Sequence, residues 1–237
     1  GVRCIAFATD ILAGVVNAEG DTKNVKILIK PPFSNVIAME QLDDDSIIMG
    51  CDNDSGEHLL LMNADGDGSI KYGIISEDGN NDLKLSFSTD KKDLENDVSP
   101  GYIQCIRKVK DFLFIAGYST IMTVNLKDMS VQHLSTPGAF CIEPVNDNEI
   151  LIGTTGAGIA GAVKNSEGRW EIAETDTVKQ IKEIVAQSGS EDKFLRITGI
   201  KVLKDKIALV SEEGLFVEIR EKQRFLEKFI KKCRGII

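Results

Sequence analysis

The sequence is poor in the residue types that build most active sites and metal sites. Among its 237 residues there are two histidines, His58 and His133, and a single tryptophan. Because histidine is the most frequent general base and a common zinc ligand, this scarcity argues against both kinds of site. Five cysteines are present, an odd number, and none forms a C-x-x-C pair. We therefore expect a reducing compartment, the cytoplasm or the nucleus, rather than a disulfide-bonded secreted protein.

Long apolar runs and an excess of basic residues are also missing. No stretch of 18 apolar residues and no signal peptide can be recognised, so we expect no membrane span. The 28 Lys and Arg residues are outnumbered by 37 Asp and Glu residues. This balance argues against direct nucleic-acid binding, because such binding needs cations to replace phosphate counterions. The chain begins with Gly1 rather than Met, which indicates a fragment, a processed product or a tag remnant.

An internal repeat organises most of the chain. Four segments align without a gap: AMEQLDDDSIIMG (38–50), CIRKVKDFLFIAG (105–117), CIEPVNDNEILIG (141–153) and GIKVLKDKIALVS (199–211). They share a small first residue, then Ile or Met, a turn at Asp or Asn, and an apolar run that ends at Gly or Ser. A fifth and shorter copy, CIAFATDILAG, covers 4–14. Such repeats indicate units that stack to bury their faces.

Each copy predicts two short strands joined by a tight turn, because Asp and Asn between apolar runs are typical of hairpins. Further strands are expected after the copies. Third strands are predicted at 25–30, 58–63, 120–126, 159–164 and 215–220. Fourth strands are predicted at 69–76, 130–135 and 170–173. Each unit is therefore expected to hold three or four strands.

Two insertions lengthen the spacing between copies. Residues 77–100 are polar and acidic, and we expect a mobile loop there that is available for contacts with other proteins. Residues 177–188 are expected to form a helix, because apolar residues recur on one helical face. Thr177 and Gln180 suit a capping box at its start, and Gly189 suits its end.

The repeat resembles the blades of WD-repeat-like β-propellers, with citron-homology-type propellers as a variant. The terminal glycines are twice 36 residues apart, and FLFIAGYSTIMTVNLKD (112–128) follows the strand, turn and strand order of a blade. The Gly-His and Trp-Asp pairs of that family are absent. The resemblance implies an all-β fold of about five four-stranded blades over residues 1–221, or the C-terminal part of a larger propeller. It also implies a non-catalytic scaffold for protein–protein interaction, a subunit of a larger intracellular assembly.

A glycine motif offers a competing interpretation. Gly156, Gly158 and Gly161 form G-x-G-x-x-G after a short apolar run, the spacing of a dinucleotide-binding loop. That function needs a helix directly after the loop, whose N-terminus holds the pyrophosphate. Residues 150–164 instead align with the predicted hairpin at 114–127. We therefore predict a glycine-rich hairpin of a blade, with dinucleotide binding as a minor alternative.

A second motif suggests calcium. Asn63, Asp65 and Asp67 stand at alternate positions before a glycine, as at the start of a calcium-binding loop. Position twelve of that loop would be Ile74, where a bidentate carboxylate is required. A tight Asp-Gly hairpin is the simpler interpretation. We predict no metal and no cofactor, and keep these three residues as weak calcium candidates.

The main alternative to a scaffold is a propeller enzyme, or a small-ligand binder, that uses the central channel. Asp and Glu cluster in the expected turns, but their spacing selects no catalytic pair. The nucleophile motif G-x-S-x-G is absent. We therefore predict no catalytic residue.

The C-terminal segment 222–237 combines an apolar stripe with many basic residues. Its apolar residues Phe225, Leu226, Phe229 and Ile230 lie on one side of a predicted helix. Two interpretations remain open. The helix packs on its own propeller, or it docks on another protein, and in the second case these four residues are the partner-binding candidates.

Overall fold

The computed structural model describes the chain in ten stretches, 4–8, 13–17, 26–29, 35–43, 46–53, 56–63, 70–187, 196–204, 206–211 and 214–219. The chain divides into two compact units. The first unit comprises Gly1–Ile115 with Met122–Gln132, and the second comprises Ala116–Ile121 with His133–Ile237. Each unit is described by itself below.

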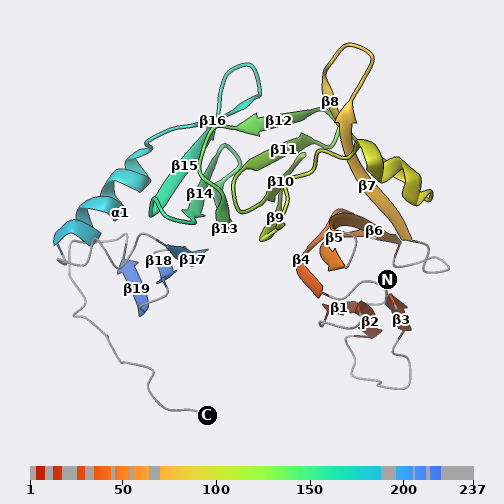
Figure 1. Cartoon of the computed structure of the whole chain (residues 1–237). Helices are drawn as coiled ribbons and strands as arrows, with labels where there is room; N and C mark the ends of the chain where they lie inside the picture. Colours follow the sequence, from red (N-terminus) through yellow and green to blue (C-terminus); the bar gives the residue numbers. More distant parts are fainter. Residues whose placement is uncertain are drawn as a thin grey trace. The chain divides into compact units, whose positions relative to one another are not determined.

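The described strands form five antiparallel sheets in which neighbours in sequence pair with one another (Figure 1). The first sheet holds β1 (Cys4–Ala8), β2 (Ala13–Asn17) and β3 (Lys26–Ile29). The second holds β4 (Asn35–Gln41), β5 (Ser46–Asn53), β6 (Gly56–Asn63), β7 (Ile70–Glu77) and β8 (Leu83–Ser88). The third holds β9 (Cys105–Val109), β10 (Phe112–Ala116), β11 (Ile121–Asn125) and β12 (Val131–Leu134).

The last two sheets belong to the C-terminal half of the chain. One holds β13 (Ala139–Asn146), β14 (Glu149–Thr154), β15 (Ile159–Lys164) and β16 (Trp170–Ile172). The other holds β17 (Ile197–Val202), β18 (Lys206–Ser211) and β19 (Gly214–Ile219). Each strand predicted from the repeat overlaps an observed strand. Each copy of the repeat therefore belongs to a sheet of its own. The prediction of an all-β fold built from blades is confirmed.

The second strand is buried in three copies, as β5, β10 and β14, because its apolar run is continuous rather than alternating. In β18 the burial alternates and Val210 is exposed. In the first unit, Leu113 and Ile115 of β10 are fully buried in one core cluster with Ile48 of β5, Leu59 of β6 and Ile75 of β7. In the second unit, the core joins strands of both sheets to a helix, α1. Burial of such side chains contributes about 1.5–3 kcal/mol each.

The glycine that ends a copy lies where the next copy begins. A Cβ atom on Gly153 would stand 2.6 Å from the carbonyl oxygen of Ile197, just as β17 starts. One on Gly50 would stand 2.6 Å from Cγ2 of Ile103, two residues before β9. The repeat therefore ends on a small residue because the following copy packs against that position.

The segment 77–100 is more than the loop that its composition predicts. It contains β8 and a short 3-10 helix, η2 (Lys91–Asn96). Strand β8 extends the second sheet and reaches the third, since the amide of Leu85 donates to the carbonyl of Met129 at 2.9 Å. Asp97 accepts a hydrogen bond from the amide of Ile75 at 2.9 Å. The alternation Leu83, Leu85, Phe87 is the strand signal, which the surrounding acidic residues obscured.

Helix α1 (Asp176–Gln187) lies one residue from the predicted helix at 177–188. Its cap differs from the predicted one, because the hydroxyl of Thr175, not of Thr177, accepts from the amide of Val178 at 3.2 Å. Val178, Ile181 and Val185 bury the apolar face of the helix in the second unit's core. Among the described residues, no helix has the length and hydrophobicity needed to cross a bilayer.

Candidate interaction surface

The G-x-G-x-x-G motif forms a β-hairpin. Strands β14 and β15 pair antiparallel, with Gly153 opposite Ile159. Thr154 closes the turn, because its hydroxyl donates to the carbonyl of Gly158 and accepts from the amide of Ala157, both at 2.8 Å. A strand rather than a helix follows, so the motif has no helix N-terminus for a pyrophosphate. The hairpin prediction is confirmed.

At two positions of the motif, the local structure requires glycine. Gly158 has a φ of 74°, a left-handed conformation that favours glycine in the turn. A Cβ atom on Gly161 would stand 2.8 Å from Cγ2 of Val178, so glycine there lets α1 pack closely on β15. Gly156 has no neighbouring atom within 4 Å of its Cβ direction. The spacing that suggests a nucleotide fold therefore arises from a turn and from helix packing.

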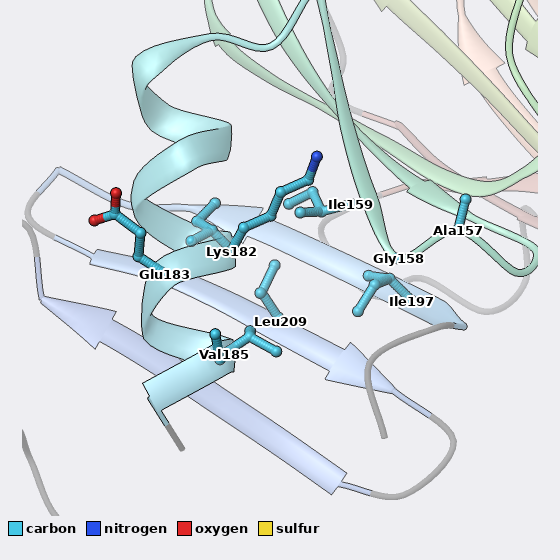
Figure 2. A pocket seen from close by; sticks show the side chains of 10 residues that line it. Ala157, Gly158, Ile159, Lys182, Glu183, Val185, Ile197 and Leu209 are labelled. Atoms are coloured by element: carbon cyan, nitrogen blue, oxygen red, sulfur yellow. The ribbon is translucent and has the colours of Figure 1, made fainter. Parts of the chain in front are cut away.

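The same turn forms one wall of an apolar cavity of about 440 Å³ in the second unit. Helix α1 forms another wall, and strands β17 and β18 the floor (Figure 2). Its apolar lining consists of Ala157, Ile159, Ile181, Val185, Ala186, Ile197 and Leu209, with Gly158 in the turn. Figure 2 shows Leu209 pointing from the strand towards α1, close to Val185. We call this space the α1 cavity.

The α1 cavity has two charged residues in its lining, Lys182 and Glu183. The ammonium of Lys182 lies 2.8 Å from the carboxylate of Glu174. The hydrogen bond from Lys182 holds the pKa of Glu174 below its usual value. Figure 2 shows the carboxylate of Glu183 pointing away from the cavity. The lining is therefore mostly apolar and suited to apolar side chains.

A second cavity, of about 370 Å³, lies in the first unit and has a more polar lining. Its lysines are engaged by neighbours. The ammonium of Lys127 lies 2.8 Å from the carboxylate of Asp111, and Lys108 donates to the carbonyl of Leu42. Two of the lysines that line this cavity are therefore engaged by neighbouring residues.

Charged residues that were not predicted from the sequence occupy the third position of the repeat. That position is Glu40, Arg107, Glu143 and Lys201 in successive copies. Glu143 is buried, its carboxylate lies 2.8 Å from the ammonium of Lys201, and it also accepts from the amide of Val202 at 3.2 Å. Glu40 and Arg107 pair at 3.7 Å. The alternation of charge between successive copies of the repeat is the sequence signal that identifies these residues.

These ion pairs join the first strands of successive sheets within each unit. Arg107 on β9 pairs with β4, and Lys201 on β17 pairs with β13. The carboxylate of Glu143 is engaged by β17 through both Lys201 and the amide of Val202. We therefore assign Glu143 to positioning of the sheets.

The two histidines, the calcium candidates and the C-terminal partner-binding candidates form no common site among the described residues, and several of them lie outside those residues. His58 is buried edge-on against Tyr72, with ring centroids 6.3 Å apart, whereas His133 is exposed on β12. Asn63 ends β6, while Asp65 and Asp67 lie outside the described residues. The partner-binding candidates of 222–237 also lie outside them. Within the described ranges, no group of three or more His, Cys, Asp or Glu side chains is placed to hold a metal ion.

Millimolar NAD, FAD or calcium is expected to leave the melting temperature of the protein unchanged. The physical reason is that the glycine motif is a hairpin and that the calcium motif lacks its twelfth-position carboxylate. Thermal shift measurements check this, since a ligand at 100 times its Kd stabilises by about 2.7 kcal/mol. A rise of several degrees with either nucleotide would contradict the hairpin interpretation.

Cys51 on β5 is expected to be an unreactive thiol. Burial raises its pKa to about 12, from an ordinary value near 9. The unfolded chain ionises first, so this thiol contributes stability below pH 9 that is lost as the pH rises towards 12. Labelling at pH 8 followed by peptide mass spectrometry should leave Cys51 unmodified until denaturant is added. In Cys51→Ala, the decline of stability above pH 9 should be smaller.

Comparison with known proteins rests on structure alone, because no family model and no curated protein matches the sequence. The CNH domain of AfRom2 superposes with a TM-score of 0.53 at 10% identity. An extracellular domain of BT4673 from B. thetaiotaomicron gives 0.52 at 15% identity. The N-terminal domain of Nup159 gives 0.50 at 9% identity.

These superpositions cover 92%, 92% and 87% of this chain in the same order. The chain spans only 65%, 26% and 49% of the respective neighbours. At these identities the likeness concerns the fold alone. The chain has the blade architecture of a β-propeller.

Proposed function

We propose that the chain is a non-catalytic scaffold for protein–protein interaction, a subunit of a larger intracellular assembly, and that a protein partner docks at the α1 cavity. The observation that supports this is the cavity itself. The inserted helix α1, the turn at 157–158 and strands β17 and β18 border an apolar hollow whose lining holds two charged residues, Lys182 and Glu183. Buried apolar pockets with a polar rim are where protein interfaces concentrate their binding energy.

The chemistry of the lining favours a protein partner over a substrate. A reactive site needs convergent polar groups, whereas the lining has Lys182 and Glu183 as its charged residues, and Lys182 is paired with Glu174. A partner would place bulky apolar side chains in the hollow that α1, the turn at 157–158 and β17 border. The acidic balance of the whole chain makes nucleic acid an unsuitable partner. The cytoplasm or nucleus remains the proposed compartment, where the cysteines stay reduced.

The test is capture of partners by the tagged full chain, compared across two matched variants. Ala186 is exposed on α1 and lines the cavity, and Gln180 is exposed on α1 outside it. We expect Ala186→Arg to reduce partner capture by about tenfold, the effect of 1.4 kcal/mol, and Gln180→Arg to leave it unchanged. Equal melting temperatures of the two variants show that folding is intact. Equal capture by both would contradict docking at the cavity.

A further inference from the structure

We infer that the chain's own C-terminal segment, residues 220–237, docks in the α1 cavity through Phe225, Leu226, Phe229 and Ile230, and competes there with outside partners. The competition rests on the proposed function, whereas the docking itself does not. The segment lies outside the described residues, but the backbone of β19, the strand before it, and the cavity that would receive it are both described.

The start of the segment is within reach of the cavity. Strand β19 pairs with β18 so that Ile219 stands opposite Lys206 and Phe216 opposite Leu209. Leu209, a cavity residue, is thus three residues along the neighbouring strand, roughly 10 Å away at about 3.4 Å per residue. Phe225 comes six residues after Ile219, which allows a reach of up to ~20 Å. Residues 220–224 are therefore long enough to let Phe225 reach the cavity from the end of β19.

The chemistry of the two surfaces matches. The stripe of the segment is aromatic and aliphatic, and the cavity is lined by Ile, Val, Leu and Ala side chains. An amphipathic helix in an apolar groove is a recurring mode of recognition, read by anchors one helical turn apart. The stripe offers such a pair of anchors in Phe225 and Phe229. A volume of about 440 Å³ admits bulky side chains, because one water molecule takes only about 30 Å³.

Charge favours the same arrangement. Residues 220–237 hold seven basic and two acidic residues, so the other 219 residues hold 21 basic and 35 acidic ones. The segment therefore carries +5 and the remainder −14, with histidine neutral. Opposite net charges attract the segment to the body, and the polar face of the helix can stay in solvent. Covalent attachment adds an effective concentration in the millimolar range.

Disulfide cross-linking in the full chain tests the docking. The segment contains a native thiol, Cys233, on the side of its apolar stripe. In Ala186→Cys, mild oxidation should give a cross-link between position 186 and Cys233 within the monomer, identified by peptide mass spectrometry. In the matched control Gln180→Cys, at an exposed position of α1 that does not line the cavity, the cross-link should be at least several-fold weaker. Equal cross-linking of both, none at all, or a cross-link found only in dimers would overturn the inference.

Hydrogen exchange gives a second readout that needs no new thiol. In the full chain carrying Phe225→Asp and Phe229→Asp, amides of α1 and of the turn at 157–159 should exchange several-fold faster than in the natural chain. Amides of β10, in the first unit, serve as the internal control and should be unchanged. Unchanged exchange around the cavity would overturn docking of the segment.

The two proposals fail in different ways. If cross-linking fails while Ala186→Arg still loses partners, the cavity binds partners and the docking inference is wrong. If cross-linking succeeds while Ala186→Arg retains every partner, the docking stands and the proposed function is wrong. If both hold, the Phe225→Asp and Phe229→Asp chain should capture several-fold more partner, because the competing segment has been released.

Discussion

Replacing Gly138 by alanine is expected to cost about 3 kcal/mol or more of stability and to lower the melting temperature by roughly 6–12 °C. Gly138 stands directly before β13, in the second unit. An added Cβ would lie 1.9 Å from the carbonyl oxygen of Tyr118 and 2.5 Å from that of Gly117. These are backbone atoms, so no side chain can turn aside to make room.

The neighbouring hydrogen bonds explain why the backbone cannot move either. The carbonyl of Gly138 accepts from the amide of Thr155 at 3.0 Å, and the amide of Ala139 donates to the carbonyl of Gly117 at 3.1 Å. Gly138 therefore joins the β10–β11 turn to the β14–β15 turn. Moving it would break bonds to both, and each net hydrogen bond contributes about 1 kcal/mol.

Gly156→Ala is the matched control for this prediction. It makes the same chemical change in the same unit, in the turn that Gly138 contacts, but no atom lies within 4 Å of the added Cβ. Its stability should stay within about 0.5 kcal/mol of the natural chain. Denaturant unfolding of the two variants measures the difference. Equal stabilities would show that the 138 position relaxes freely, and the close-contact argument would be wrong.

The sequence predicted the fold through the register of the repeat. Gly50 and Gly153 end two copies of it, and in each unit a glycine of this set packs against the start of the next copy. The continuous apolar runs correctly indicated the buried second strands. Strand β8 was missed because a composition-based interpretation of 77–100 outweighed its period-two pattern, Leu83, Leu85, Phe87. In this segment, the alternation of apolar and polar residues predicts the strand better than the overall composition does.

The candidate site was harder to predict, because it comes from distant parts of the chain. Ala157 in a turn, Ile181 on α1 and Leu209 on β18 meet only once the sheets have packed. The helix itself was expected from its periodicity, but nothing local tells what its exposed edge faces. The glycine motif pointed to a real feature for the wrong reason, since Gly161 makes room for α1 and not for a phosphate.

Reversing a charge at the third position of the repeat is expected to cause the second large loss of stability. Lys201→Glu is expected to destabilise the protein by about 2–3 kcal/mol, because it places a second carboxylate beside the buried carboxylate of Glu143. The cost is below that of a fully buried pair because the side chain of Lys201 is 59% exposed. Urea unfolding at neutral pH measures it.

The rescue by Glu143→Lys separates charge pairing from packing. With both residues exchanged, a lysine faces a glutamate again, and we expect about half or more of the lost stability to return. Full recovery is not expected, because a lysine at position 143 cannot accept the hydrogen bond that the amide of Val202 donates at 3.2 Å. The single variant Glu143→Gln keeps that acceptor and should lose only the ionic part. If the exchanged pair is no more stable than Lys201→Glu alone, the alternation of charge along the repeat does not join β13 to β17.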